Sequence, residues 1–158
     1  YLTALGERIA LKIIRRHRLI ELYLVRELGY ALHEVHDEAE ALEHTVSERF
    51  IQAISDKMDN PLFDPHGDPI PAPDGTLPQR TLQPLSELPL NTPACISRLT
   101  ATNADMLVHT QNKGFTLSTK VIVTARDPFE GPLTVQLAGD EKVIGHLLAK
   151  TILVETLA

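Results

Sequence analysis

The segment His36-x3-Glu40-x2-Glu43-His44 places two imidazoles and two carboxylates at positions i, i+4, i+7 and i+8 of one helix. On a helix of 3.6 residues per turn, these four positions fall within roughly 100° of arc. A cluster of this kind is expensive to bury without a cation, because desolvated carboxylates need a compensating charge. The segment therefore predicts a helix with a metal site on one face, and a solvated acidic face is the alternative.

A second pair, His17-x3-Glu21, repeats the imidazole–carboxylate spacing upstream. One such pair is common on helix surfaces and indicates little by itself. Two such stretches on adjacent antiparallel helices are more specific than either alone, so we expect all six side chains to belong to metal sites. The remaining histidines are interpreted as structural; they are His33, His66, His109 and His146.

The first third of the chain has the pattern of two long amphipathic helices. Between Leu5 and Met58 there is no proline, and apolar residues recur at helical spacing on both sides of Gly29, which predicts a stop. Helices over 5–28 and 35–58 would form a helical hairpin. A hairpin of two helices leaves apolar surface uncovered, which predicts a homodimer.

The proline content rises sharply after the helical region: nine of the eleven prolines lie between Pro61 and Pro93. Neither a helix nor a central strand tolerates that density, so this part is predicted to be a linker with turns. Beyond it, the apolar period shifts towards two, which predicts strands at 95–99, 120–124, 133–137 and 151–154 and a small barrel. The predicted fold class is α+β, with a helical domain at 1–59, a proline-rich linker at 60–92 and a barrel at 93–158.

Composition excludes several classes of protein. A net charge of −6 gives the 158 residues no basic field for a phosphate backbone, and the single Cys95 cannot form an internal disulfide. No apolar run approaches the roughly 20 residues of a membrane helix, so a cytoplasmic protein is expected. Nucleophile-elbow, P-loop and dinucleotide motifs are missing, which argues against an enzyme. The chain opens on Tyr1 within a helical pattern and is expected to be part of a longer protein.

Four strings in the chain resemble the diphtheria toxin repressor family of metal-dependent transcriptional regulators. They are Leu2-Thr3-x2-Gly6, Arg16-His17-Arg18-Leu19-x-Glu21, Val35-His36-Asp37-Glu38-Ala39-x3-Glu43-His44 and Pro65-His66-Gly67-x-Pro69-Ile70-Pro71. The resemblance implies a winged helix that binds operator DNA, a helical dimerisation domain and an SH3-like barrel. The first string would be the end of the wing, so the DNA-binding domain would lie almost wholly outside these residues.

Carried over residue by residue, the resemblance implies two metal sites. The ancillary site maps to His17, Glu21 and His36. The primary site maps to Glu40, Glu43 and His44, and side chains of the missing N-terminal helix would complete it. Position 40 is a cysteine in the iron-responsive type member and a glutamate in the manganese-responsive branch. A carboxylate there lets Mn(II) compete, because soft thiolates favour later metals; Mn(II) is therefore expected over Fe(II).

Two questions stay open from the residues alone. In relatives with the barrel, a glutamate and a glutamine three residues later reach the ancillary metal, but this chain has Asn103 and Met106 there. Either Asp105 substitutes, or the barrel does not ligate the metal. The alternatives to a repressor are a ferritin-like di-metal carboxylate enzyme, with four helices supplied by a dimer, and a metal-independent adaptor barrel.

Overall fold

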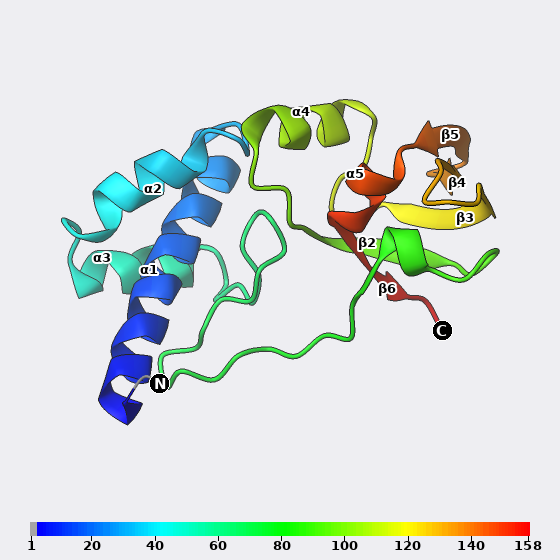
Figure 1. Ribbon diagram of the computed structural model, residues 1–158. Helices are drawn as coiled ribbons and strands as arrows, with labels where there is room; N and C mark the ends of the chain where they lie inside the picture. The colour runs from blue at the N-terminus through cyan, green and yellow to red at the C-terminus, as the bar shows by residue number, and fades with distance from the viewer. Residues whose placement is uncertain (1–2) are drawn as a thin grey trace. The chain divides into compact units, whose positions relative to one another are not determined.

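The first helix, α1 (Ala4–Leu28), has a clear start and stop in the computed structural model, which describes residues 3–158 (Figure 1). The Thr3 side chain accepts a hydrogen bond from the Gly6 amide at 3.1 Å and caps the helix. At the other end Gly29 adopts φ +74°, and the Tyr30 amide donates to the Leu24 carbonyl at 3.0 Å. The predicted stop is thus confirmed. Of the string expected to end a wing, Thr3 caps this helix and Gly6 lies inside it, so neither belongs to a strand, and Leu2 lies outside the described residues.

The predicted second long helix is wrong, because the structure breaks it into α2 (Val35–Glu43) and α3 (Glu48–Lys57). Ser47 has an extended backbone, and its side chain accepts from the Phe50 amide at 3.1 Å, which caps α3. The Thr45 hydroxyl donates to the Leu42 carbonyl at 3.0 Å. These local hydrogen bonds compete with a continuous helix, so Glu43 and His44 lie at a helix end.

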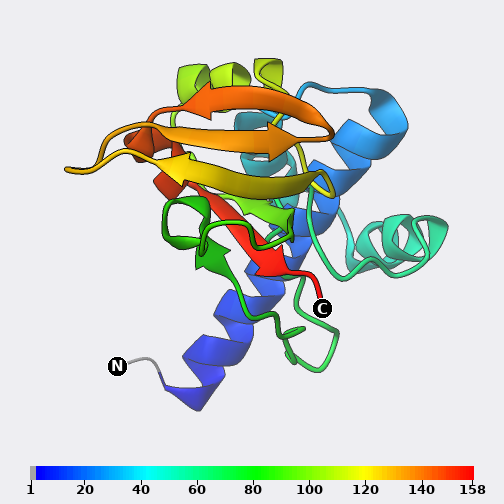
Figure 2. The ribbon, with the colours of Figure 1, turned by 90° about the vertical axis from the view of Figure 1, so that its right-hand side faces the viewer.

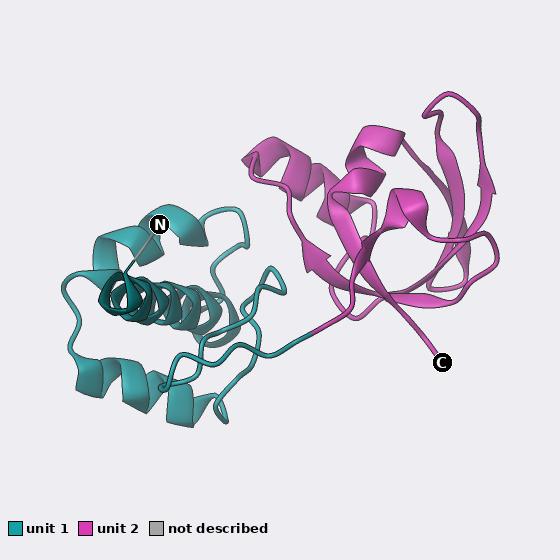
Figure 3. Ribbon diagram, turned by 60° about the horizontal axis from the view of Figure 1, so that its bottom comes forward, with its two compact units in different colours: residues 1–79 teal, residues 80–158 magenta. Residues whose placement is uncertain are grey.

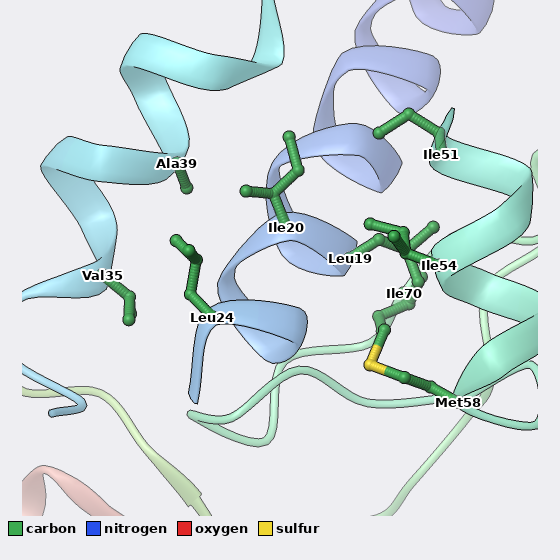
Figure 4. Close-up of a cluster of buried hydrophobic side chains, with 9 residues drawn as sticks. All are labelled: Leu19, Ile20, Leu24, Val35, Ala39, Ile51, Ile54, Met58 and Ile70. Carbon is green, nitrogen blue, oxygen red and sulfur yellow. The ribbon is translucent and has the colours of Figure 1, made fainter. Parts of the chain in front are cut away.

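The hydrophobic core of this unit forms around α1 (Figure 4). Ile20 and Leu24 face α2, whereas Leu19 faces α3. This arrangement holds the histidine-bearing stretch of α1 close to both of the shorter helices. The buried side chains that form the cluster are Leu19, Ile20, Leu24, Val35, Ala39, Ile51, Ile54, Met58 and Ile70.

The first part of the proline-rich stretch folds back onto the helices. Ile70 is buried in the core, and its amide donates to the Leu62 carbonyl at 2.8 Å. Arg15 donates to the Pro71 carbonyl at 2.8 Å, and Arg18 donates to the Pro69 carbonyl. Proline removes amide donors but leaves carbonyl acceptors, and the arginines of α1 use these to fix the segment.

The chain divides into two compact units, residues 1–79 and 80–158 (Figure 3). The stretch expected to be a linker, 60–92, is shared between them. Residues up to Gln79 belong with the helices, and those from Arg80 onward belong with the sheet.

The second unit is a six-stranded antiparallel sheet in the order β1-β6-β2-β3-β4-β5 (Figure 2). Register shifts within the β2–β6 and β3–β4 pairs bend it. The four predicted strands are confirmed, and two strands and three short helices are additional. The elements are β1 (Gln83–Pro84), η1 (Leu85–Glu87), β2 (Ala94–Leu99), α4 (Ala104–Asn112), β3 (Lys120–Arg126), β4 (Leu133–Leu137), β5 (Asp140–Ile144), α5 (His146–Lys150) and β6 (Ile152–Thr156).

The fold class is α+β, as the sequence predicts: helices followed by a small, bent sheet. Within residues 3–158, every helix is too short or too polar to cross a membrane.

Candidate metal centre

Three of the predicted ligands converge where α1 meets α2. His17 Nε2 lies 3.0 Å from Glu21 Oε1 and 3.1 Å from His36 Nδ1. The third side of the triangle, His36 Nδ1 to Glu21 Oε1, measures 3.4 Å. One atom from each residue therefore points to a common region, and the three atoms are close enough to bind one cation. The helical spacing places His17 beside Glu21, but only the packing of α2 on α1 adds His36.

Glu43 connects this triangle to the end of α2. Its Oε2 lies 2.7 Å from His17 Nδ1, and its Oε1 lies 3.1 Å from His44 Nε2. The side chain is mostly buried, whereas His44 is exposed. The two predicted sites are therefore linked through one carboxylate that contacts a histidine from each.

Glu40 lies on the exposed part of α2. It belongs to neither of the clusters of described residues that are close enough to hold one ion. Of the six predicted ligands, the structure thus brings together His17, Glu21, His36 and Glu43, and attaches His44 to them through Glu43.

The structure adds two residues that the sequence interpretation missed. His66, which we expected to be structural, places Nδ1 3.6 Å from Glu21 Oε2 and 4.0 Å from Asp64 Oδ2. Glu21, Asp64 and His66 form a second group that fits one ion. The only signal in the sequence was the string Pro65-His66-Gly67, whose place in the fold local periodicity does not encode.

The loop that carries His66 is ordered by Asp64. Asp64 Oδ1 accepts hydrogen bonds from the amides of His66 and Asp68, at 2.8 and 2.9 Å. This closed turn fixes the direction of the His66 side chain towards Glu21. The loop is therefore a third element of the candidate site, beside α1 and α2.

Charges in the site are strongly coupled. Burial alone would raise the pKa of Glu21, but hydrogen bonds from His17 and His66 outweigh it and lower the pKa to about 2. The pKa of His17 is raised, chiefly by its hydrogen bond to Glu21. Burial, together with the neighbouring Asp68, raises the pKa of Asp64 to about 6. The pKa of His66 is raised as well, by its hydrogen bond to Glu21 and by nearby carboxylates, which outweigh its burial.

The donor set suits a divalent transition metal. Imidazole nitrogens and carboxylate oxygens surround Glu21, whose side chain is only 4% exposed. A buried carboxylate between several imidazoles is stable only with a proton or a cation beside it. These donors fit Mn(II) and Fe(II), which accept mixed nitrogen and oxygen ligands.

The residues aligned with the barrel ligands of the relatives lie at the start of α4. Asn103 caps α4, and its side-chain oxygen accepts from the Met106 amide at 3.1 Å. Asp105 is exposed in the first turn of that helix. Whether Asp105 binds the ancillary metal is not tested by these contacts.

Comparison with known proteins gives two adjoining matches. Residues 3–72 match the iron-dependent repressor metal-binding and dimerisation domain, and residues 83–156 match the FeoA domain. The first match contains every residue of the candidate site described above. The second corresponds to the six-stranded unit.

Individual relatives cover almost the whole chain. A solved manganese-dependent transcriptional repressor in complex with manganese is 39% identical, with a TM-score of 0.92, over 99% of this chain and 75% of that one. The structure of IdeR from T. acidophilum is 27% identical, with a TM-score of 0.83, over 99% of this chain and 71% of that one. The iron-dependent repressor IdeR of Mycobacterium leprae is 29% identical over 167 aligned positions, which cover 98% of this chain and 72% of the relative.

Together, the helical unit with its metal-type cluster and the FeoA unit define a class of metal-responsive regulators. The chain belongs to the diphtheria toxin repressor family of manganese- and iron-dependent transcriptional repressors. Members of this family are repressors and not enzymes, so the ferritin-like alternative has no support. The resemblance stated from the sequence is confirmed.

Proposed function

We propose that this chain senses Mn(II), and Fe(II) less well, as the metal-binding and dimerising part of a transcriptional repressor. The observation that carries the proposal is the convergence of His17, Glu21 and His36, with Glu43 joined to the same cluster. These side chains come from two helices, so a metal bound among them ties the helices together.

The proposal includes two sites. One site uses His17, Glu21 and His36. Asp64 and His66 form a second group with the same Glu21 carboxylate and could add ligands to this site. The other uses Glu43 and His44 together with Glu40, which is the residue that the geometry supports least. We therefore propose two metal sites per chain, with these residues as their ligands.

The preference for Mn(II) rests on the chemistry of the donors. All the side chains proposed as ligands offer nitrogen or oxygen, and a site without thiolate gives later, softer metals a smaller advantage. A solved relative that is 39% identical is a manganese-dependent transcriptional repressor in complex with manganese, which supports the same preference.

Metal binding would act by selecting one arrangement of the helical unit. A metal shifts such an equilibrium only as far as it binds one state more tightly than the other. In a cytoplasmic homodimer, this clamp would fix the spacing of paired winged helices on an operator of two half-sites. We propose that those winged helices lie outside the 158 residues, because residues 3–72 match the metal-binding and dimerisation domain and residues 83–156 match the FeoA domain.

The test is titration calorimetry with Mn(II) on the 158-residue chain and its alanine variants. We expect His17→Ala to abolish the tighter binding event and His44→Ala to weaken a separate, weaker one. His109→Ala, at an exposed histidine of α4, is the matched control and should bind as the parent does. If His44→Ala removed the tighter event and His17→Ala left it intact, the two-site assignment would be wrong.

A further inference from the structure

Arg16 lies beside the ligand His17 in the sequence, yet its side chain reaches the turn between α2 and α3. Its Nε donates to the Glu43 carbonyl at 2.9 Å, and the two terminal nitrogens bind the Val46 carbonyl and the Glu48 carboxylate. The side chain is only 14% exposed. One guanidinium therefore holds the end of α2, the connecting turn and the start of α3.

These hydrogen bonds pair backbone carbonyls at the end of α2 and in the following turn. The last carbonyls of a helix have no partner within the helix and must find one elsewhere. The break after Glu43 creates such carbonyls immediately beside the proposed ligands Glu43 and His44. A planar guanidinium can satisfy several acceptors in one fixed geometry, which a lysine ammonium or a glutamine amide cannot reproduce.

The neighbouring residue of α1, His17, also contacts the side chain of Glu43. While Arg16 binds its backbone carbonyl, His17 Nδ1 lies 2.7 Å from its carboxylate. We propose that Arg16 is a positioning residue, which fixes the end of α2 so that Glu43 and His44 keep the positions that their metal site requires. The proposal rests on the proposed function, which assigns Glu43 and His44 as ligands.

Arg15 offers a matched control one position away. It lies on the same helix, is also partly buried, and donates to the Pro71 carbonyl at 2.8 Å and to Ser55 Oγ at 3.3 Å. These contacts also tie a distant segment to α1, but they do not involve the turn that follows Glu43. Arg15→Gln thus removes the same charge and a comparable anchor without touching the end of α2.

The experiment compares Arg16→Gln, Arg16→Lys and Arg15→Gln in the 158-residue chain. Mn(II) affinity is measured by calorimetry, and amide hydrogen exchange of residues 42–47 is followed without metal. We expect Arg16→Gln to weaken Mn(II) binding at the site that includes His44 by roughly 10- to 100-fold, the usual effect of losing a group that orients a ligand. Exchange at 42–47 should rise in this variant only, and Arg16→Lys should recover part of the affinity.

The outcomes separate positioning from a general loss of stability. Equal losses of affinity in Arg15→Gln and Arg16→Gln, or unchanged affinity in Arg16→Gln, would overturn the role of Arg16 alone. If the unsubstituted chain bound no Mn(II), the proposed function would fail, and the role of Arg16 would fail with it. A selective loss in Arg16→Gln, with faster exchange only at 42–47, supports the proposal.

Discussion

At the scale of single residues, Glu21 is the centre of this molecule's chemistry. Its carboxylate lies within 4 Å of His17, His36 and His66, and it belongs to both groups that fit an ion. With such neighbours, the proposed metal site would exchange protons for a metal ion. In the metal-free chain, the raised pKa values of His17 and His66 favour their protonated forms, and a metal would have to displace those protons in order to bind.

The metal-free chain should therefore have a stability optimum on the acid side of neutrality. The pKa values of His17 and His66 are raised, so their contribution is complete below about pH 6.5 and is lost as the pH rises through the raised values. The pKa of Glu21 is lowered to about 2, so its contribution is present above about pH 4.5 and is lost as the pH falls towards 2. Asp64 acts in the opposite sense to Glu21. Its pKa is raised from 3.8 to about 6, so its contribution to stability is complete below about pH 3.8 and is lost as the pH rises through 6.

We expect thermal melts of the metal-free chain to peak between about pH 4.5 and 6.5. Mn(II) binding at pH 6 should release protons, which is detected by calorimetry in buffers of different ionisation enthalpy. His17→Ala should reduce this release. An equal heat of binding in all buffers would contradict the picture of competing protons.

Glu40 supports a prediction about metal choice. Replacing it with cysteine introduces a soft thiolate beside Glu43 and His44, which should move the preference from Mn(II) towards Fe(II), Co(II) or Zn(II). The affinity of Glu40→Cys should also depend more steeply on pH around neutrality, because the thiol must lose a proton. Competition between metals, followed anaerobically by operator binding of the full-length protein, measures the ranking.

Glu38→Cys is the matched control for this change, since Glu38 is an exposed glutamate of the same helix outside the predicted ligand set. Its metal ranking should equal that of the parent. An unchanged ranking in Glu40→Cys would show that position 40 is not a ligand, and the preference for Mn(II) would lose its main chemical support.

At the scale of elements, the break between α2 and α3 is the feature that shapes the site. The apolar pattern continues from Val35 to Met58 and favours one helix, but Thr45 and Ser47 hydrogen-bond the backbone locally and divide it. The break places Glu43 and His44 at a helix end, within reach of α1. Arg16 then supplies donors for the carbonyls that the break exposes.

Ser47→Ala should destabilise this unit by about 1 kcal/mol, the usual cost of losing a helix N-cap. Urea unfolding of the metal-free chain measures the change. Ser47→Asp keeps an acceptor for the Phe50 amide and should remain close to the parent in stability. Higher helical content with no loss of stability in Ser47→Ala would mean that the two helices can fuse, against the capping argument.

At the scale of the whole molecule, the described structure leaves apolar side chains of α1 uncovered. Leu5 is 68% exposed, Ile9 52% and Ile13 41%, and the three lie at i, i+4 and i+8 on one stripe. Phe50 of α3 is also exposed, whereas Ile54 is buried in the core of its own unit. Because Ile54 is buried within one chain, the stripe on α1 is the better candidate surface for a homodimer.

Sedimentation at micromolar concentration should show twice the mass of one chain. Ile9→Glu should shift the equilibrium to monomers with little change in thermal stability, because the side chain is exposed within one chain. Leu147→Glu, at an exposed leucine of the other unit, should leave the dimer intact. A monomer in the unsubstituted chain would contradict the assigned dimerisation surface.

The sequence by itself determined the contacts that lie within one turn of a helix or along one strand. His17 and Glu21 are neighbours because of the 3.6-residue period, Gly29 ends α1 because it tolerates a positive φ, and four strands follow from a period of two. Such patterns are local, and they fix which side chains share a face.

Only the tertiary structure decided which faces meet. His17 contacts Glu43 and His36 because α2 packs against α1, and His66 approaches Glu21 because the proline-containing loop folds back onto the helices. The break at Ser47 likewise depends on competition between local hydrogen bonds and a continuous helix, with donors from Arg16 stabilising the result. Contacts between residues far apart in the chain depend on packing and on partners in other elements, which no periodicity within one element encodes.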